Sequence, residues 1–303
     1  MKPVELAPMA GVTDKAFRKM VRLFGQQRLH TEMIGVESLV RRHPATCKMM
    51  NVKDEENVVV QLVGERTDAF SEATRMAEQA GAVGIDINMG CPVKKLISNG
   101  SGAALMKTPD VAARIVECVK QATTLPVSVK TRLGWDMSHI NVVSFAQLMA
   151  NAGADKLTIH ARTKEQGYSG LANWDMVRQV KESVSIPVFI NGDIVDKTSA
   201  EQALSRTQAD GISVGRGALG KPWLLSELET GEKPDINMAD LICRHLDLML
   251  AEYGAHGVYV ARKHLAWYAS GQKNVAQFRQ KVYAETNVEK IKEMIYLFFK
   301  EVS

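Results

Sequence analysis

Cysteine is scarce in this sequence: four occur in 303 residues, Cys47, Cys91, Cys118 and Cys243, and no two have the CxxC spacing. Zinc sites and disulfide frameworks depend on closely spaced or paired cysteines, so we expect neither a metal site nor a disulfide. One thiol is a candidate for chemistry. The others are expected to pack as small apolar side chains.

Long apolar runs are also missing. No segment approaches the roughly 18 consecutive apolar residues that a membrane span requires. The first residues, MKPVELAPMAG, do not have the composition of a signal peptide. We therefore expect a cytoplasmic protein without a membrane partner. The formal net charge of +4 permits a polyanionic partner but does not demonstrate one.

The sequence also lacks a GxGxxG turn, which is typical of a doubly wound dinucleotide-binding sheet. Instead, strand-like segments alternate regularly with segments whose apolar residues have helical spacing. These strands begin at Val4, Arg28, Val58, Gly84, Pro126, Lys156, Pro187 and Gly211. The alternation predicts an α/β fold, a parallel TIM (β/α)8 barrel, with the doubly wound sheet as the alternative.

The pattern changes at Gly231–Pro234, whose sequence GEKP is typical of a turn or linker. From Met238 onwards the apolar residues have helical spacing and no strand pattern follows. We predict a barrel domain over residues 1–232 and a small helical bundle over residues 233–303.

One stretch, Gly84–Pro92 (GIDINMGCP), combines a strand pattern with a thiol. Ile85 and Ile87 alternate with polar residues, and Gly90 and Pro92 flank Cys91. A lone cysteine is usually an inert buried side chain. In a barrel, however, active sites lie at the carboxyl ends of the strands, which is where Asn88 and Cys91 fall.

The other strands also end in polar residues or glycine. Such groups are costly to bury together unless a polar ligand pairs with them. Asn191-Gly192-Asp193 and Gly215-Arg216-Gly217 together favour a phosphate site made of backbone amides and one guanidinium, although either motif alone is more often a simple turn. Lys130 is suited to stabilising negative charge on a bound ring, with a salt bridge as the alternative. His160 is either a ligand contact or a core histidine, and Gln61 suits the edge of a heterocycle.

Two loops are candidates for contact with a polyanion. Lys94–Lys107 contains several glycines and is bordered by lysines, which is typical of a mobile cover but also of a plain solvated loop. Lys164–Gly170 carries Tyr168, an aromatic side chain available for stacking on a base.

Six motifs in order and register resemble the bacterial tRNA-dihydrouridine synthases. They are APMAGVTD from Ala7, INMGCP from Ile87, VKTRLGW from Val129, HART from His160, NGD from Asn191 and GRGALGKPW from Gly215. The segment RKHLAWYASG from Arg262 is similar to the B-type, NifR3-like branch. The resemblance covers nearly the whole chain and is weakest over about the last thirty residues. The stretch before PMAG is shorter than usual in the family.

The resemblance implies an FMN-containing barrel and a helical tRNA-binding domain that together reduce uridine in the D-loop of tRNA with NADPH. It places Cys91 as general acid and Asn88 against the uracil. The residues that it implies for flavin binding are Pro8, Met9, Ala10, Gln61, Lys130, His160, Asn191, Gly192, Asp193, Gly215 and Arg216.

In the implied reaction, reduced flavin gives a hydride to C6 of uracil and Cys91 gives a proton to C5. The uracil must leave its stack to reach the cavity. We expect a monomer, with tRNA contacts from Lys94, Lys95, Arg132, Arg162, Arg262 and Lys263. Two alternatives are a flavin-dependent dehydrogenase of a small pyrimidine and a flavin-bearing RNA-binding chaperone.

Overall fold

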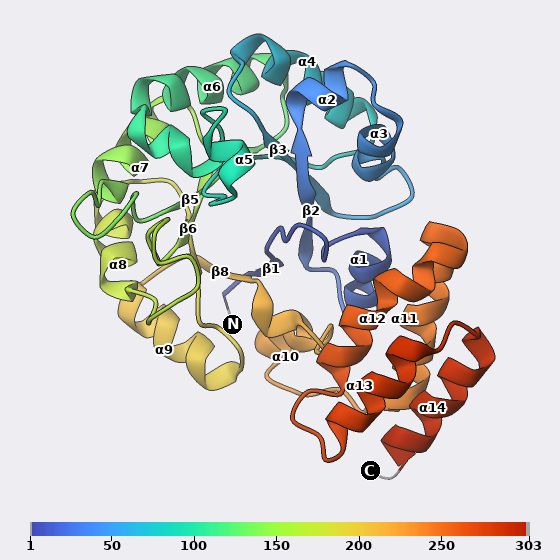
Figure 1. Ribbon diagram of the computed structural model, residues 1–303. Coiled ribbons are helices and arrows are strands. Elements are labelled where there is room, and N and C mark those ends of the chain that lie inside the picture. Colours follow the sequence, from blue (N-terminus) through green and yellow to red (C-terminus); the bar gives the residue numbers. More distant parts are fainter. Residues whose placement is uncertain (1, 301–303) are drawn as a thin grey trace.

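A closed barrel of parallel strands forms the larger part of the molecule in this computed structural model, which describes residues 2–300 (Figure 1). The strands follow one another around the barrel in sequence order, and β8 pairs with β1. They are β1 (Val4–Leu6), β2 (Arg28–Gly35), β3 (Val58–Val63), β4 (Ile85–Met89), β5 (Val127–Arg132), β6 (Lys156–His160), β7 (Val188–Asn191) and β8 (Gly211–Val214). The predicted TIM barrel is confirmed.

Helices surround the barrel, as the helical spacing between the strands predicts (Figure 1). Those of the barrel are α1 (Lys15–Arg22), α2 (Val36–Val40), α3 (Pro44–Met50), α4 (Thr67–Gln79), α5 (Lys94–Ile97), α6 (Pro109–Ala122), α7 (Val142–Asn151), α8 (Trp174–Ser183), α9 (Lys197–Thr207) and α10 (Leu224–Thr230). Short 3-10 turns lie at η1 (Gly102–Lys107) and η2 (Arg216–Ala218).

The register of the strands gathers polar side chains at defined levels of the barrel. Gln61 of β3 is opposite Asp86 of β4, which is opposite Ser128 of β5. Two residues further along, Asn88 is opposite Lys130. Because neighbouring residues in register lie on the same side of a sheet, these groups are brought within hydrogen-bonding reach.

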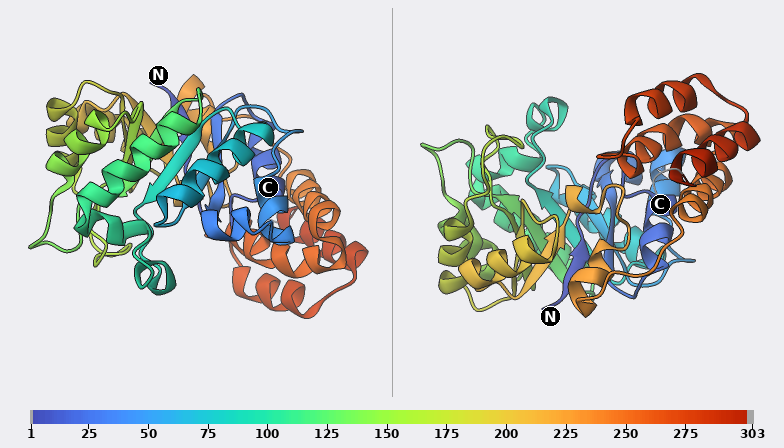
Figure 2. Two further views of the ribbon diagram at one scale, coloured as in Figure 1. Left: turned by 90° about the horizontal axis from the view of Figure 1, so that it is seen from above. Right: turned by 90° about the horizontal axis from the view of Figure 1, so that it is seen from below.

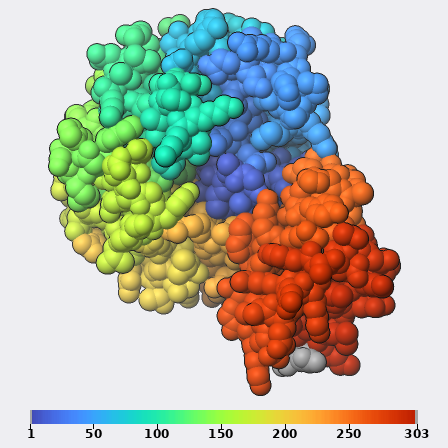
Figure 3. Space-filling view, in the orientation of Figure 1, coloured from blue at the N-terminus to red at the C-terminus, as the bar shows by residue number. Residues whose placement is uncertain are grey.

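A helical bundle follows the barrel and forms a separate lobe beside it (Figures 1 and 3). It consists of α11 (Met238–Tyr253), η3 (Gly254–His256), α12 (Gly257–Tyr268), α13 (Val275–Ala284) and α14 (Val288–Lys300). The helical character of this region is confirmed. The boundary between residues 232 and 233 stays a prediction, and residues 1 and 301–303, at the outer ends of the predicted domains, lie outside the described part of the chain.

Helix α1 belongs to two hydrophobic cores. Phe17 and Val21 pack in the core of the barrel, whereas Ala16 and Met20 pack in the core of the bundle. Residues four apart lie on one face of a helix, so each pair presents its own face. Helix α1 therefore connects the barrel and the bundle by packing in both of their cores.

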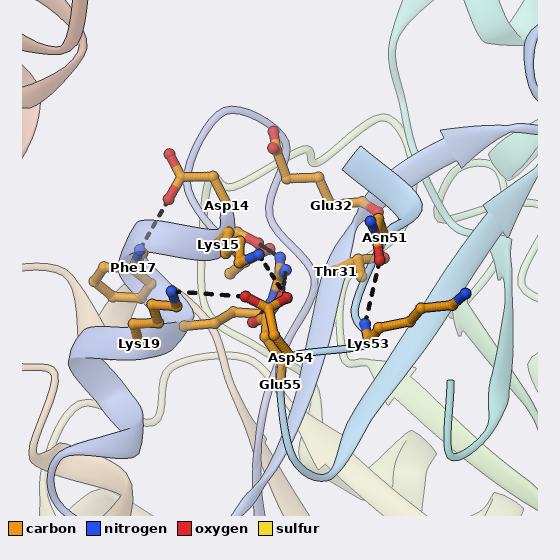
Figure 4. A network of polar contacts seen from close by, with 12 residues as sticks. Asp14, Lys15, Phe17, Lys19, Thr31, Glu32, Asn51, Lys53, Asp54 and Glu55 are labelled. Carbon is orange, nitrogen blue, oxygen red and sulfur yellow. Dashed lines mark hydrogen bonds and ion pairs between the residues drawn. The ribbon is translucent and has the colours of Figure 1, made fainter. Parts of the chain in front are cut away.

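Polar contacts hold α1 against the segment before β3 (Figure 4). The Asp14 carboxylate caps the helix by accepting from the Phe17 amide at 2.9 Å. Lys15 pairs with Asp54 at 2.6 Å, and the buried Arg18 pairs with Glu55 at 2.5 Å. Arg18 also donates to the Thr13 carbonyl at 2.7 Å, which holds the end of the loop that contains Pro8, Met9 and Ala10.

Helix α5 and the bundle project on the same side of the barrel in both views of Figure 2. The N-terminal residues lie on the opposite side. The carboxyl ends of the strands lie on the side of α5, because α5 directly follows β4.

Candidate active site

A cavity of about 660 Å³ opens at the carboxyl ends of the strands. Its volume is in the range of small-molecule and cofactor sites. It brings together most of the residues predicted from the sequence: Pro8, Met9, Ala10, Gln61, Asn88, Cys91, Lys130, Arg132, His160, Asn191, Gly192, Asp193, Gly215 and Arg216. The residues predicted at the strand ends therefore line one shared cavity.

The turn that carries Cys91 is fixed by Asn88. The Asn88 Oδ1 atom accepts from the amides of Gly90 at 3.2 Å and Cys91 at 2.9 Å. On the other side, the Cys91 carbonyl accepts from the Ala103 amide at 3.1 Å. Burial raises the pKa of the Cys91 thiol, so the thiol keeps its proton at neutral pH.

Gly102 lies directly against this turn. Its φ is +60°, and a Cβ atom at this position would lie 2.8 Å from the Cys91 carbonyl oxygen and 3.2 Å from the Cys91 Cβ. A side chain is therefore opposed both by backbone conformation and by space. Glycine at this position permits the close approach of η1 to the thiol.

Lys130 places an ammonium group at the cavity wall. Its Nζ donates to Asn191 Oδ1 at 3.1 Å, and Asn191 Nδ2 donates to the Ser213 carbonyl at 2.7 Å. Burial, with a smaller contribution from the positive charge of Arg132, lowers the pKa of Lys130 to about 8. The side chain is therefore mostly charged at neutral pH but loses its proton more easily than an ordinary lysine.

His160 is held in the neutral form. Burial lowers its pKa below the ordinary value, and the nearby charges of Lys130 and Arg132 lower it further. A neutral imidazole has one donor nitrogen and one acceptor nitrogen. His160 is thus suited to hydrogen bonding rather than to charge pairing.

The loops after β7 and β8 form the other wall. Gly192 has a φ of +122°, and Gly217 has no space for a side chain because a Cβ atom would lie 2.3 Å from the Ile194 carbonyl oxygen. The half-exposed Arg216 guanidinium lies 3.8 Å from the Asp193 carboxylate. This wall has the glycines and the guanidinium that the sequence predicted for a phosphate site.

Arg132 and Arg162 are buried and bonded to loops of the barrel. Arg132 donates to the carbonyl oxygens of Gly90 at 2.8 Å and Thr163 at 2.9 Å. Arg162 Nη2 lies 2.8 Å from both oxygens of Asp193. Their contact with tRNA stays a prediction, since in this structure both guanidinium groups hold active-site loops together.

Five predicted residues lie outside the cavity lining: Arg162 and four others. Lys94 and Lys95 are exposed on α5. Arg262 of α12 stacks on Tyr259, with 4.6 Å between its Cζ atom and the ring centroid. Lys263 donates to the carbonyl of Gly11, in the loop that lines the cavity.

Some cavity residues were not predicted as site residues. Ser213 lies within β8 and Met33 follows an irregularity in the pairing of β2, so neither has a motif to mark it. Tyr168 also lines the cavity, and its ring lies 4.5 Å from Arg216 Cζ and 5.7 Å from Arg132 Cζ. The sequence indicates an aromatic side chain in an exposed loop, but it does not show that this ring lies beside two arginines.

Among residues 2–300, no group of three or more His, Cys, Asp or Glu side chains could hold a metal ion. Within the same residues, every helix is too short or too polar to cross a membrane.

Comparison with known proteins identifies the family. The sequence model described as "Dihydrouridine synthase (Dus)" matches residues 5–302. The chain belongs to the dihydrouridine synthase family. A probable tRNA-dihydrouridine synthase of Rickettsia prowazekii is 43% identical over 99% of this chain and 95% of its own length. A protein named tRNA-dihydrouridine synthase B, from Xanthomonas axonopodis pv. citri, is 39% identical over 91% of this chain and 86% of its own length. The predicted family resemblance is confirmed.

Solved structures outside this dihydrouridine synthase group share the barrel. Histamine dehydrogenase from Rhizobium sp. 4-9 superimposes with a TM-score of 0.58 at 14% identity, covering 81% of this chain and 48% of that protein. An old yellow enzyme homologue from Zymomonas mobilis gives a TM-score of 0.53 at 13% identity, covering 78% and 91%. At such low identity the likeness concerns the fold alone.

Proposed function

We propose that this member of the dihydrouridine synthase family is an FMN-dependent tRNA-dihydrouridine synthase. It reduces the C5=C6 bond of specific uridines in the D-loop of tRNA and takes its electrons from NADPH. The observation that carries the proposal is the Cys91 thiol, which is held in a fixed turn beside Asn88 in a cavity that also contains Lys130 and Arg216. The relatives named as tRNA-dihydrouridine synthases support it.

The residues of the cavity fit a phosphorylated flavin. Ser213 lines the cavity, and its buried Oγ atom has no hydrogen-bond partner among the described residues. A buried hydroxyl without a partner is costly, which favours a polar ligand at this point. Gly192, Gly215 and Arg216 would hold the phosphate, whereas Gln61, Lys130 and His160 would face the ring. FMN bound here supplies the hydride for C6 of uracil.

Cys91 acts as the general acid in this proposal. Its raised pKa keeps the proton on Sγ at neutral pH, and that proton goes to C5 of uracil. Asn88 both fixes the Cys91 turn and lines the cavity, so it is placed to orient the base. The ammonium of Lys130 stabilises negative charge on the ring system.

Transfer RNA would bind across the side of the barrel from which α5 and the bundle both project. Lys94 and Lys95 of α5 contact its backbone on one side of the cavity, and Arg262 and Lys263 contact it on the other. Phosphate contacts over this wide face offset the few kcal/mol that extrusion of a stacked base costs.

Site-by-site mapping of dihydrouridine in tRNA from a strain that lacks this gene tests the proposal. We expect at least one D-loop position to lose dihydrouridine, the wild-type gene to restore it and the Cys91→Ala gene not to restore it. An unchanged profile in a strain without a redundant synthase would contradict the proposal. Turnover of free pyrimidine without tRNA would favour a small-molecule dehydrogenase, and tRNA binding without any reduction would favour a chaperone.

A further inference from the structure

A chain of hydrogen bonds runs from the interior of the barrel to the turn that carries Cys91. At its inner end, Asp86 of β4 is buried and accepts two bonds: Ser128 Oγ donates to Oδ1 at 2.5 Å and Gln61 Nε2 donates to Oδ2 at 2.6 Å. At its outer end, Asn88 Nδ2 donates to Gln61 Oε1 at 2.9 Å, and Asn88 Oδ1 accepts from the Cys91 amide at 2.9 Å.

The two ends of this chain have opposite and fixed character. An ionised carboxylate only accepts hydrogen bonds, whereas a backbone amide only donates them. Gln61 and Asn88 lie between the two ends, and each has one oxygen and one nitrogen on its amide. With Asp86 accepting and the Cys91 amide donating, every bond is satisfied in one orientation of the two side chains. Reversal of either amide would set donor against donor or acceptor against acceptor.

This orientation determines what the cavity offers to a ligand. Both oxygens already accept bonds within the chain, whereas each amide nitrogen has a second N–H beyond the bond that it makes there. Gln61 and Asn88 both line the cavity. This part of the wall therefore offers hydrogen-bond donors, which match carbonyl oxygens and acceptor nitrogens on a bound ring.

We propose that Asp86 is a positioning residue whose buried carboxylate fixes the direction of this chain, so that Gln61 and Asn88 present amide nitrogens to the bound flavin and uracil. The inference rests on the proposed function, because the ligands are those of the synthase reaction. Asp86 does not itself line the cavity. It acts through Gln61, and its charge also favours the ammonium form of Lys130.

The affinity of the cofactor-free, full-length protein for FMN tests the inference. It is measured by the quenching of flavin fluorescence on binding. Asp86→Ala removes the acceptor from Gln61 and should weaken FMN binding by about tenfold or more, because the Gln61 amide is then no longer held in the orientation that presents its nitrogen to the ring. Asp86→Asn should weaken it by less than about threefold, because its amide oxygen still accepts from Gln61 while the Ser128 hydroxyl turns to accept.

Ser128→Ala is the matched control. It removes the other bond to the same carboxylate but leaves Gln61 in place, so FMN affinity should stay within about threefold of the wild type. The absorption spectrum of the bound flavin should change in Asp86→Ala and not in Ser128→Ala. Wild-type affinity in Asp86→Ala would overturn the inference, and so would an Asp86→Asn variant as weak as Asp86→Ala, because charge rather than orientation would then be responsible. Failure of the wild type to bind FMN would instead contradict the proposed function.

A second pair of variants applies if Asp86→Ala does not fold. Gln61→Glu sets two carboxylates against each other at a hydrogen-bond distance, so it should lower the urea midpoint of unfolding, and more so at pH 8 than at pH 5, where the pair shares a proton. Adding Asp86→Asn to Gln61→Glu should regain at least half of that loss, because the new amide donates to Glu while Glu still accepts from Asn88. A double variant that loses the sum of the two single losses would overturn the inference.

Discussion

The ammonium of Lys130 on β5 donates to the amide oxygen of Asn191 on β7, with 3.1 Å between Nζ and Oδ1. Asn191 is fixed in turn by its bond to the Ser213 carbonyl on β8. Because the ammonium donates to a neutral amide rather than to a carboxylate, its positive charge remains available to a ligand. This arrangement distinguishes Lys130 from Lys156, whose ammonium pairs with Glu5 at 2.5 Å inside the barrel.

The pKa of Lys130 gives a pH dependence of stability with a defined sign. The folded-state value of about 8 is below the ordinary 10.5, so between these values the unfolded chain holds a proton that the folded chain has lost. Stability therefore rises with pH through this window. Urea unfolding of cofactor-free protein should show the wild type gaining stability relative to Lys130→Met from about pH 7 to about pH 10. Parallel profiles for the two proteins would show that Lys130 has an ordinary pKa.

Cys91→Ala separates chemistry from binding. Loss of a general acid typically costs about 10²–10⁴-fold in rate, so dihydrouridine formation should fall by at least about 100-fold. The dissociation constant for tRNA, measured by filter retention, should change by less than about twofold. Binding is expected to depend on lysine and arginine side chains that contact the tRNA phosphates, and the uncharged thiol contributes no such contact. Cys118→Ala is the control and should retain full activity, because this half-buried thiol donates to the Thr67 carbonyl and does not line the cavity.

Gly102 gives a prediction about geometry near the thiol. Gly102→Ala should push the Cys91 turn away from its position, because the new Cβ would lie 2.8 Å from the Cys91 carbonyl oxygen. We expect dihydrouridine formation to fall by about tenfold or more, since small displacements of a reacting group are costly. Gly167→Ala is the matched control: Gly167 has a similar φ of +56° but nothing within 4 Å of a new Cβ. Equal losses in the two variants would assign the effect to backbone strain alone.

Lys94 and Lys95 are predicted to bind tRNA phosphates. The Lys94→Ala, Lys95→Ala double variant should weaken tRNA binding and lower the slope of log affinity against log salt by about 1 for each lysine. Lys120→Ala with Lys181→Ala removes the same charge near the carboxyl ends of α6 and α8, on the other face of the barrel, and should leave the slope unchanged. Identical salt slopes for the two double variants would count against a role of α5 in binding.

Much of the fold could be predicted because its signals are local. The strands of the barrel follow from short, largely apolar segments that alternate with segments of helical spacing, and the candidate site follows from the polar residues where those strands end. Cys91 and Lys130 were found in this way, and both line one cavity.

Other features depend on contacts between distant segments. Arg132 and Arg162 stay predicted tRNA contacts, but their bonds to the backbone carbonyls of neighbouring loops could not be predicted, because these bonds depend on how the loops lie in space. The Asp86–Gln61 bond joins residues 25 apart and depends on the register of β3 and β4, which a pattern along one strand does not contain.

The double role of helix α1 has a consequence for how substrates are selected. Its two faces pack into both hydrophobic cores, so the bundle cannot swing relative to the barrel without opening one of them. The distance between the bundle and the cavity is therefore fixed. A tRNA that binds the bundle as proposed would offer to the cavity only a base at a set distance from that contact, so that the choice among uridines would depend on length and angle more than on neighbouring sequence.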